Sequence, residues 1–228
     1  MITSTRNAAV TSVVRNGCDR PVGEHYYSLV HWLRTVGDAS GVAPKTIGIT
    51  SCANGAGVST VAANLAIAAA QISHEPVLLL DLSGARPELA KRSGKSGAAD
   101  LREAPDDVSQ YGERIEPSPI ANLSLLVANF PRDVRALEMD FAKGNDLVGT
   151  LENDFGFIVV DLPTVESSLC FVTAGLLSGV LLVMEAERTR SDTAARAKQR
   201  LIDARANVLG IILNKHPQHL PNWLESRL

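Results

Sequence analysis

A loop of small residues between two apolar segments contains the residue types that bind phosphate. It reads Cys-Ala-Asn-Gly-Ala-Gly-Val-Ser-Thr from Cys52 to Thr60, and small side chains allow backbone N–H groups to converge on an anion. Gly55 and Gly57 permit that close approach, and the helix expected from Ser59 adds a favourable dipole. The expected chemistry is phosphate binding, with the Ser59 hydroxyl placed to reach Mg²⁺. A tight strand-to-helix turn without a ligand is the alternative.

The loop departs from the common phosphate-loop pattern G-x-x-x-x-G-K-[ST] at two positions. Val58 stands where the pattern has the lysine that bridges the β- and γ-phosphates, and Cys52 stands at the first glycine. The loop therefore lacks its main positive charge. Taken alone, it leaves the ligand-binding and the purely structural interpretations open.

Short apolar runs alternate with helical patterns around this loop, which is typical of βαβ units. The expected strands are Thr46–Ser51, Val77–Asp81, Leu123–Ala128, Phe157–Asp161, Gly179–Met184 and Val208–Asn214. Their nearly continuous apolar character indicates strands covered on both faces by helices. The predicted fold class is α/β, an open, mostly parallel sheet between two helical layers, with ligands outside the carboxyl ends of the strands.

The expected helices cover most of the remaining pattern. They are Glu24–Arg34, Ser59–Ile72, a stretch from Asp133 to Glu152 broken at Gly144, and Ser191–Arg205. One uncharged run, from Ser167 to Met184, touches the lower length limit of a membrane-spanning helix. Its small and polar residues favour a short helix followed by a buried strand instead.

Composition limits the classes of protein that the chain can belong to. It has 228 residues, 45% of them hydrophobic, with 22 Lys+Arg against 25 Asp+Glu and a net charge of −3. A protein that wraps nucleic acid needs a clustered basic surplus, so no nucleic-acid partner is expected. Three cysteines without C-x-x-C spacing predict no Cys-based metal site. We expect a cytoplasmic domain over residues 24–215, between a flexible segment (1–23) and a tail (216–228).

Five segments occur in a distinctive order. They are Thr50–Thr60 with Asn64-Leu65-Ala66 after it, Leu80–Pro87, Val160–Thr164, Gly179–Val183 and Val208–Lys215. This order resembles the bacterial tyrosine kinase family, the cytoplasmic P-loop kinases of capsule and exopolysaccharide assembly, which lie within the MinD/ParA-like group. The resemblance covers the chain from about Glu24 to its C-terminus, and the ordered set is more specific than any single motif.

The resemblance implies a site for ATP or ADP with Mg²⁺. It assigns nucleotide binding to Gly55, Ala56, Gly57, Val58, Ser59, Thr60 and Asn214, the last as the base-contacting asparagine. It assigns Asp81 and Asp161 as catalytic residues, and Ser59, Asp81 and Asp161 as Mg²⁺ ligands. Each assignment has a structural alternative: a carboxylate can cap the turn after its strand, Asn214 can simply end its strand, and the chain can bind no nucleotide.

Neutral residues occupy positions that the family keeps charged. They are Val58, Ser83, Leu169 and Ser178. Phosphoryl transfer depends on positioning and electrostatic stabilisation, and removal of one such group commonly lowers the rate by about 10²–10³. Residues 214–228 also contain no tyrosine, whereas the family phosphorylates tyrosines there, and Tyr27 and Val30 replace two arginines of its oligomerisation motif. Weak or absent catalysis is therefore expected.

Two classes of function follow from this pattern. The first is a regulatory pseudokinase of exopolysaccharide or capsule synthesis, held at the inner membrane by a chain-length regulator or export protein and able to form a homo-oligomer. The second is an active kinase or ATPase with a lysine recruited from elsewhere in the chain, such as Lys45, Lys91 or Lys95, or from another subunit. A positioning ATPase of the MinD/ParA type is weaker, because its additional loop lysine falls near Cys52.

Overall fold

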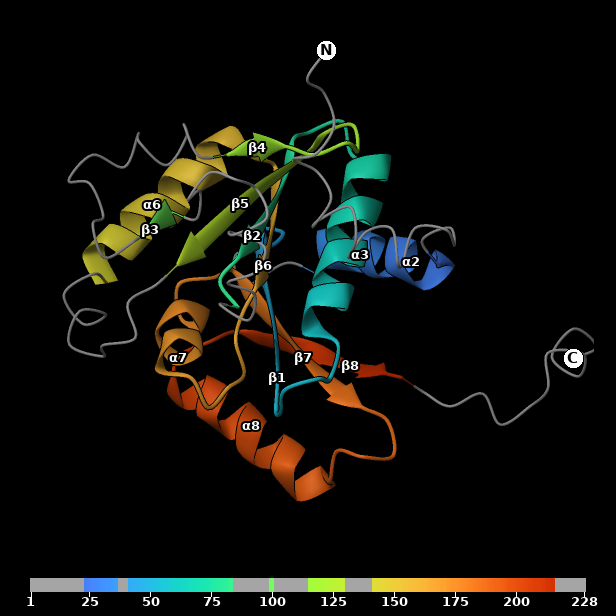
Figure 1. The fold of residues 1–228 in the computed structure, drawn as a ribbon, viewed down its shortest axis with the longest axis vertical. Coiled ribbons are helices and arrows are strands. Elements are labelled where there is room, and N and C mark those ends of the chain that lie inside the picture. The colour runs from blue at the N-terminus through green and yellow to red at the C-terminus, as the bar shows by residue number, and fades with distance from the viewer. Residues whose placement is uncertain (1–22, 37–40, 84–98, 101–114, 130–140, 216–228) are drawn as a thin grey trace, which may run out of the picture.

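The strands of the chain form one mostly parallel sheet (Figure 1). The computed structural model describes residues 23–36, 41–83, 99–100, 115–129 and 141–215. The described strands are β1 (Thr46–Ser51), β2 (Val77–Asp81), β3 (Ala99–Asp100), β4 (Glu116–Pro117), β5 (Leu123–Asn129), β6 (Phe157–Asp161), β7 (Gly179–Glu185) and β8 (Val208–Asn214). Their spatial order is β3-β5-β2-β6-β1-β7-β8, and β4 pairs antiparallel with β5. The loop of interest follows β1, a central strand.

Helices cover both faces of the sheet, as the apolar runs predict. The described helices are α2 (Glu24–Thr35), α3 (Val58–Ile72), α6 (Phe141–Asp154), α7 (Ser168–Ala174) and α8 (Ser191–Asp203). Helices α2 and α3 lie on one side in Figure 1, and α6, α7 and α8 lie on the other. Two apolar clusters match these layers: one joins Leu33 and Leu65 to the sheet, and the other joins Leu151 and Leu201 to it.

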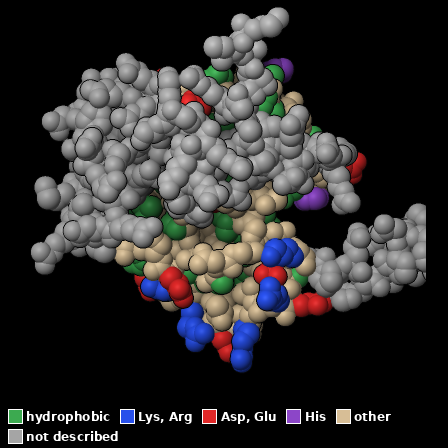
Figure 2. Space-filling view, viewed as in Figure 1, with side chains coloured by type: hydrophobic (Ala, Val, Ile, Leu, Met, Phe, Trp, Pro, Cys, Tyr) green, Lys and Arg blue, Asp and Glu red, His purple; other side chains and the backbone are tan. Residues whose placement is uncertain are grey.

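The central strands are fully buried, which explains their continuous apolar sequences. Every residue of β1 and β6 is buried. The edge strand β8 differs from this prediction, because Ile211 and Leu213 are 50% and 55% exposed. Helix α8 buries Ala194, Ala197 and Leu201. Charged side chains of both signs gather over α8 in Figure 2. An edge position leaves one side of a strand without a neighbour.

Strand boundaries agree closely with the sequence predictions. Four of the predicted strands have the predicted ends, and β5 and β7 each extend one residue further. The break expected at Gly144 is wrong, because α6 runs through that glycine. The first part of the predicted stretch, residues 133–140, lies outside the described residues. A glycine inside a helix costs only about 1 kcal/mol relative to alanine, and Leu151 packs α6 against the sheet.

The uncharged run from Ser167 to Met184 forms a short helix and then a strand, as predicted. Helix α7 occupies its first half, and β7 pairs with β1 and β8 in its second half. Among the residues that the structure describes, no helix is long and apolar enough to cross a membrane. The predicted domain limits remain predictions, because residues 1–22 and 216–228 lie outside the described part.

Helix α2 packs across α3 through the two positions that replace the family's arginines. The side chain of Val30 is fully buried in the cluster beneath α2. The Tyr27 hydroxyl donates a hydrogen bond to Gln71 Oε1 on α3, and the Arg34 guanidinium donates one to Ser73 Oγ at 2.7 Å. Tyr27 and Val30 therefore serve the contact between α2 and the rest of the domain.

Candidate functional site

The loop between β1 and α3 has backbone features that favour an anion. Gly55 and Gly57 have φ values of +84° and +96°, in the left-handed region that favours glycine. Gly57 precedes the first helical residue, and its carbonyl accepts the N–H of Val61 at 3.0 Å. No side chain caps α3, so the first-turn N–H groups of Val58, Ser59 and Thr60 have no helical acceptor. Such a helix start favours an anion.

The end of β8 holds this loop from one side. The Asn214 side-chain amide donates a hydrogen bond to the carbonyl of Ala56 at 2.8 Å. The Lys215 ammonium donates one to the carbonyl of Gly55 at 2.6 Å. Sequence reasoning singled out Asn214 but assigned no role to Lys215, because the two residues and the loop are about 160 positions apart in the chain.

Lys215 also lies beside a carboxylate at the end of β7. Its ammonium is 3.5 Å from Glu185 Oε1, which Arg188 contacts at 3.1 Å. The hydrogen bond from Arg188 is the largest cause that lowers the pKa of Glu185, and the charge of Lys215 contributes in the same direction. Glu185 thus remains ionised and holds both cations at the carboxyl end of the sheet.

Two carboxylates end neighbouring strands close to the loop. Asp81 and Asp161 are partners in the register of β2 and β6, and neighbouring strands lie about 4.8 Å apart. Leu80 and Val160 face the cluster under α6, α7 and α8. Because side chains alternate along a strand, both aspartates face the α3 side. Asp161 is 4% exposed.

Asp81 also caps its own turn. Its Oδ1 accepts hydrogen bonds from the backbone N–H of Ser83 at 2.9 Å and from the Ser83 hydroxyl at 2.7 Å. This is the structural alternative that the sequence left open, and a cap on one oxygen leaves the second oxygen of the carboxylate for another role. Ser83 is therefore an internal partner of Asp81.

The oxygen donors at this edge fit Mg²⁺. The cation prefers oxygen ligands, and it is usually held by one or two carboxylates together with phosphate oxygens. Ser59 in the first turn of α3, Asp81 and Asp161 supply such oxygens. In the described part of the chain no three His, Cys, Asp or Glu side chains gather into a metal site. A cation here would therefore depend on the phosphates of a nucleotide.

The comparisons with known proteins agree with this geometry. No protein-family model matches the chain. The putative tyrosine-protein kinase CapB of Staphylococcus aureus is 28% identical over 181 residues, which is 76% of each chain. The tyrosine-protein kinase CpsD of Streptococcus agalactiae is 28% identical over 205 residues, covering 84% of this chain and 82% of CpsD. The chain is a relative of the bacterial tyrosine kinases.

Solved structures place this tyrosine-kinase-like chain in the same fold. The chimerical protein CapA2B2 superposes with a TM-score of 0.69 at 25% identity over 90% of both chains. The VpsO kinase domain gives 0.62 at 26% identity, over 76% of this chain and 86% of VpsO. The Pyrococcus horikoshii MinD protein complexed with Mg-ADP gives 0.58 at 20% identity, over 80% and 76%, which shows a shared fold. The P-loop NTPase fold predicted from the sequence is confirmed.

Two of the neutral replacements in this tyrosine-kinase-like chain pack as apolar residues. The Val58 side chain packs against the cluster beneath α2 and α3. The Leu169 side chain packs against the opposite cluster. Neither side chain carries a charge or a polar atom, so neither can bind a phosphate oxygen or Mg²⁺.

One replacement lies far from the site, so the count of four lost charges is wrong. Ser178 bonds Thr46 at the first residue of β1: its N–H donates to Thr46 Oγ1 at 2.8 Å, and the two hydroxyls are 2.9 Å apart. The loop leaves β1 after Ser51, about five residues or 17 Å away along the strand. Val58, the first residue of α3, and Ser83, which bonds Asp81, remain as neutral replacements beside the site.

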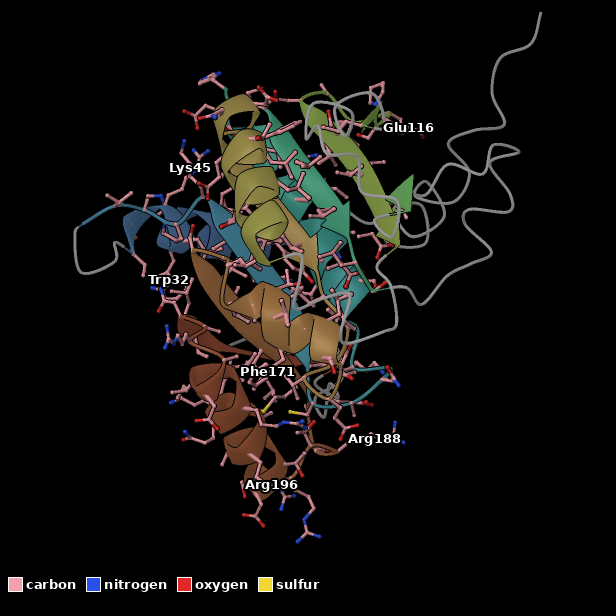
Figure 3. The ribbon with its side chains drawn as sticks, turned by 90° about the vertical axis from the view of Figure 1, so that its left-hand side faces the viewer. Trp32, Lys45, Glu116, Phe171, Arg188 and Arg196 are labelled. Carbon is pink, nitrogen blue, oxygen red and sulfur yellow. The ribbon has the colours of Figure 1, made fainter. Side chains whose placement is uncertain are left out.

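Lys45 is excluded as a recruited loop lysine by the same geometry. Its ammonium donates to the Glu152 carbonyl at 3.4 Å, at the amino end of β1. Figure 3 shows Lys45 at the upper left of the domain, far from Arg188 at the lower right. Lys91 and Lys95 lie outside the described residues, as do Arg86, Pro87 and residues 216–228. Among the lysine side chains that the structure describes, Lys215 is the one that contacts the loop.

Hydrogen bonds connect the end of β1 to the loop that follows β6. The Thr50 hydroxyl donates to the Pro163 carbonyl at 2.6 Å and lies 3.3 Å from Cys170 Sγ. Burial raises the pKa of the Cys170 thiol to about 11. The backbone N–H of Val165 donates to the carbonyl of Ser51 at 3.0 Å. The loop after β6 is therefore tied to the end of β1, directly before the phosphate-binding loop.

Proposed function

We propose that this tyrosine-kinase-like P-loop protein is a regulatory pseudokinase of exopolysaccharide or capsule biosynthesis that binds ADP or ATP with little turnover. The observation that carries the proposal is the packing of Val58 into the apolar cluster beside a loop whose backbone keeps the phosphate-binding shape. Such a loop retains the groups that hold a ground-state phosphate and lacks the charge that stabilises its transfer.

The remaining site residues have roles consistent with this function. Backbone N–H groups of residues 56–60 hold the phosphates. Ser59, Asp81 and Asp161 hold Mg²⁺, which neutralises phosphate charge when it is bound. Asn214, whose amide nitrogen supports Ala56, retains its side-chain oxygen for the amino group of a base. Asp81 keeps one oxygen engaged by Ser83, which weakens its hold on a catalytic cation.

The partner in this proposal is a membrane chain-length regulator or export protein of the same polysaccharide system. The relatives named as CapB and CpsD kinases and the likeness to the CapA2B2 chimera support it. Nucleotide state in the chain would then regulate the partner at the inner membrane, without tail phosphorylation.

Calorimetry and turnover measurements on the purified chain test this proposal. We expect ADP and ATP to bind, more tightly with Mg²⁺ than with EDTA, while ATP hydrolysis stays about 10²-fold or more below an active kinase domain assayed alongside. Turnover equal to that of the active domain would contradict the pseudokinase assignment. If neither ADP nor ATP binds, the proposed nucleotide binding is contradicted.

An active kinase or ATPase is the second candidate, because the ammonium of Lys215 contacts the loop. In that case Lys215→Met would abolish measured hydrolysis of ATP while Lys198→Met, on the exposed face of α8, would not. Undetectable hydrolysis by the wild-type chain removes this candidate. A MinD-type ATPase has support from the fold alone.

A further inference from the structure

We propose that Lys215 is the positioning residue of the phosphate-binding loop, and that its contact with Gly55 prepares the loop for a diphosphate group in the absence of the usual loop lysine. This inference rests on the proposed nucleotide binding. It concerns how the loop is held before a ligand arrives.

Peptide geometry links the contact to the ligand side of the loop. In a trans peptide the C=O and N–H groups point in opposite directions, and the described residues contain no cis peptide bond. The carbonyls of Gly55 and Ala56 point to Lys215 and Asn214, respectively. The N–H groups of Ala56 and Gly57 therefore point away from β8. The carbonyl oxygens of Gly55 and Ala56, which would repel an anion, are thereby kept on the side of the loop that faces β8.

The glycines of the loop allow this orientation but do not enforce it. Gly55 and Gly57 occupy left-handed backbone conformations at φ +84° and +96°, and glycine visits many others at similar energy. A loop with that freedom loses much conformational entropy when it binds an anion. Contacts that restrict the loop beforehand reduce that loss and raise affinity.

Lys215 is itself held in an uncommon conformation, which indicates a specific contact. Its φ is +55°, a region that few non-glycine residues adopt. Its ammonium bonds the Gly55 carbonyl and lies 3.5 Å from Glu185 Oε1. Arg188 holds the same carboxylate oxygen at 3.1 Å. The carboxylate thus gives the ammonium a second partner besides the loop carbonyl.

The position of the ammonium separates this role from catalysis. It contacts a loop carbonyl, on the side away from the N–H groups that would face phosphate. A cation there supports the ground-state loop and makes no bond to a transferring phosphoryl oxygen. Loss of Lys215 should therefore loosen the loop and weaken binding of inorganic pyrophosphate.

Three variants of the full chain test the inference: Lys215→Met, Lys215→Arg and the control Lys198→Met. Hydrogen exchange of a peptide covering residues 52–60 is measured without ligand, and pyrophosphate affinity is measured by calorimetry. We expect Lys215→Met to speed exchange of that peptide and to weaken pyrophosphate binding about tenfold. Lys215→Arg restores both, because a guanidinium can also donate to the carbonyl, and Lys198→Met matches the wild type.

The two readouts separate this inference from the proposed function. Unchanged exchange in Lys215→Met overturns the positioning role, even if pyrophosphate binding weakens through lost charge. Faster exchange with unchanged pyrophosphate affinity overturns the link to phosphate. If the wild type binds neither pyrophosphate nor ADP, the proposed nucleotide binding fails, and with it the phosphate part of the inference. The melting temperature of each variant is measured as well, so that global unfolding can be recognised as a cause of either change.

Discussion

Asp81 and Asp161 are aligned partners on β2 and β6, and their side chains turn to the same face of the sheet. Asp161 is buried, and Ser83 engages one oxygen of Asp81. Two adjacent carboxylates repel each other, and a divalent cation removes that repulsion. In the proposed function, the pair would therefore link Mg²⁺ to nucleotide binding at this edge.

Replacement of Asp81 by asparagine should remove the Mg²⁺ dependence of ADP affinity. An asparagine oxygen can still accept from Ser83, so the turn survives while the charge is lost. We expect the affinity ratio measured with Mg²⁺ and with EDTA to fall to about one, with the melting temperature preserved. Asp81→Ala serves as the comparison and should lose about 1 kcal/mol of stability with the cap. A retained Mg²⁺ effect in Asp81→Asn would exclude Asp81 as a ligand.

Restoring the loop lysine should improve binding more than turnover. Val58→Lys supplies the phosphate charge, but Ser83 still occupies the position of the second acidic residue. We expect tighter ATP binding and hydrolysis that remains about 10²-fold or more below an active kinase domain assayed alongside. Steady-state ATPase assays of Val58→Lys and of Val58→Lys with Ser83→Asp measure this. Strong turnover by the single variant would show that Val58 alone is responsible for the loss.

Substitution of Gly57 should damage the loop, and Gly149 provides a control. A Cβ at Gly57 would lie 2.3 Å from Asn214 Nδ2, at φ +96°. Gly57→Ala should therefore cost about 1–3 kcal/mol of unfolding free energy. Gly149 lies in α6 with open space around it, so Gly149→Ala should stabilise the helix by roughly 0.5–1 kcal/mol. Denaturant unfolding distinguishes the two; equal effects would contradict the Asn214 contact.

An acidic residue at position 178 should not affect the nucleotide site. Ser178→Asp restores the charge expected from the family pattern, but Ser178 contacts Thr46 at the amino end of β1. We expect ADP affinity to match the wild type and stability to fall by about 1–2 kcal/mol, because the Thr46 contacts are disturbed. Ser178→Ala should lower stability by less than Ser178→Asp does. A change in ADP affinity beyond twofold would place Ser178 closer to the site than the structure does.

The Cys170 thiol should resist alkylation at neutral pH. Burial raises its pKa to about 11, and the thiolate is the reactive form. At pH 8 about one molecule in a thousand carries the thiolate, and that fraction rises tenfold per pH unit until the pKa is reached. Mass spectrometry after iodoacetamide treatment should find Cys170 unmodified in the folded chain and modified in urea. Rapid modification of the folded chain at pH 8 would contradict this burial.

The sequence by itself determined the six longer strands, the two-sided covering of the central sheet and the loop after β1, but not the two-residue strands β3 and β4. Continuous apolar runs specify buried parallel strands, and the glycines between Cys52 and Thr60 specify the left-handed backbone of the loop. Both signals lie in short stretches of sequence, so they can be recognised without knowledge of the fold. The boundary of α6 was less certain, because a glycine in a helix is only a weak signal.

Only the tertiary structure decided which charges share the site. Ser178 replaces a charged residue of the family's pattern, but it lies at the amino end of β1, as Lys45 does, and the loop follows the other end of that strand. Lys215 reaches the loop only because β8 and β1 end at the same edge of a parallel sheet, with β7 between them. A residue 160 positions away from Gly55 carries no sequence signal for that contact. The contact between Lys215 and Gly55 forms because the carboxyl ends of the parallel strands meet at one edge of the sheet.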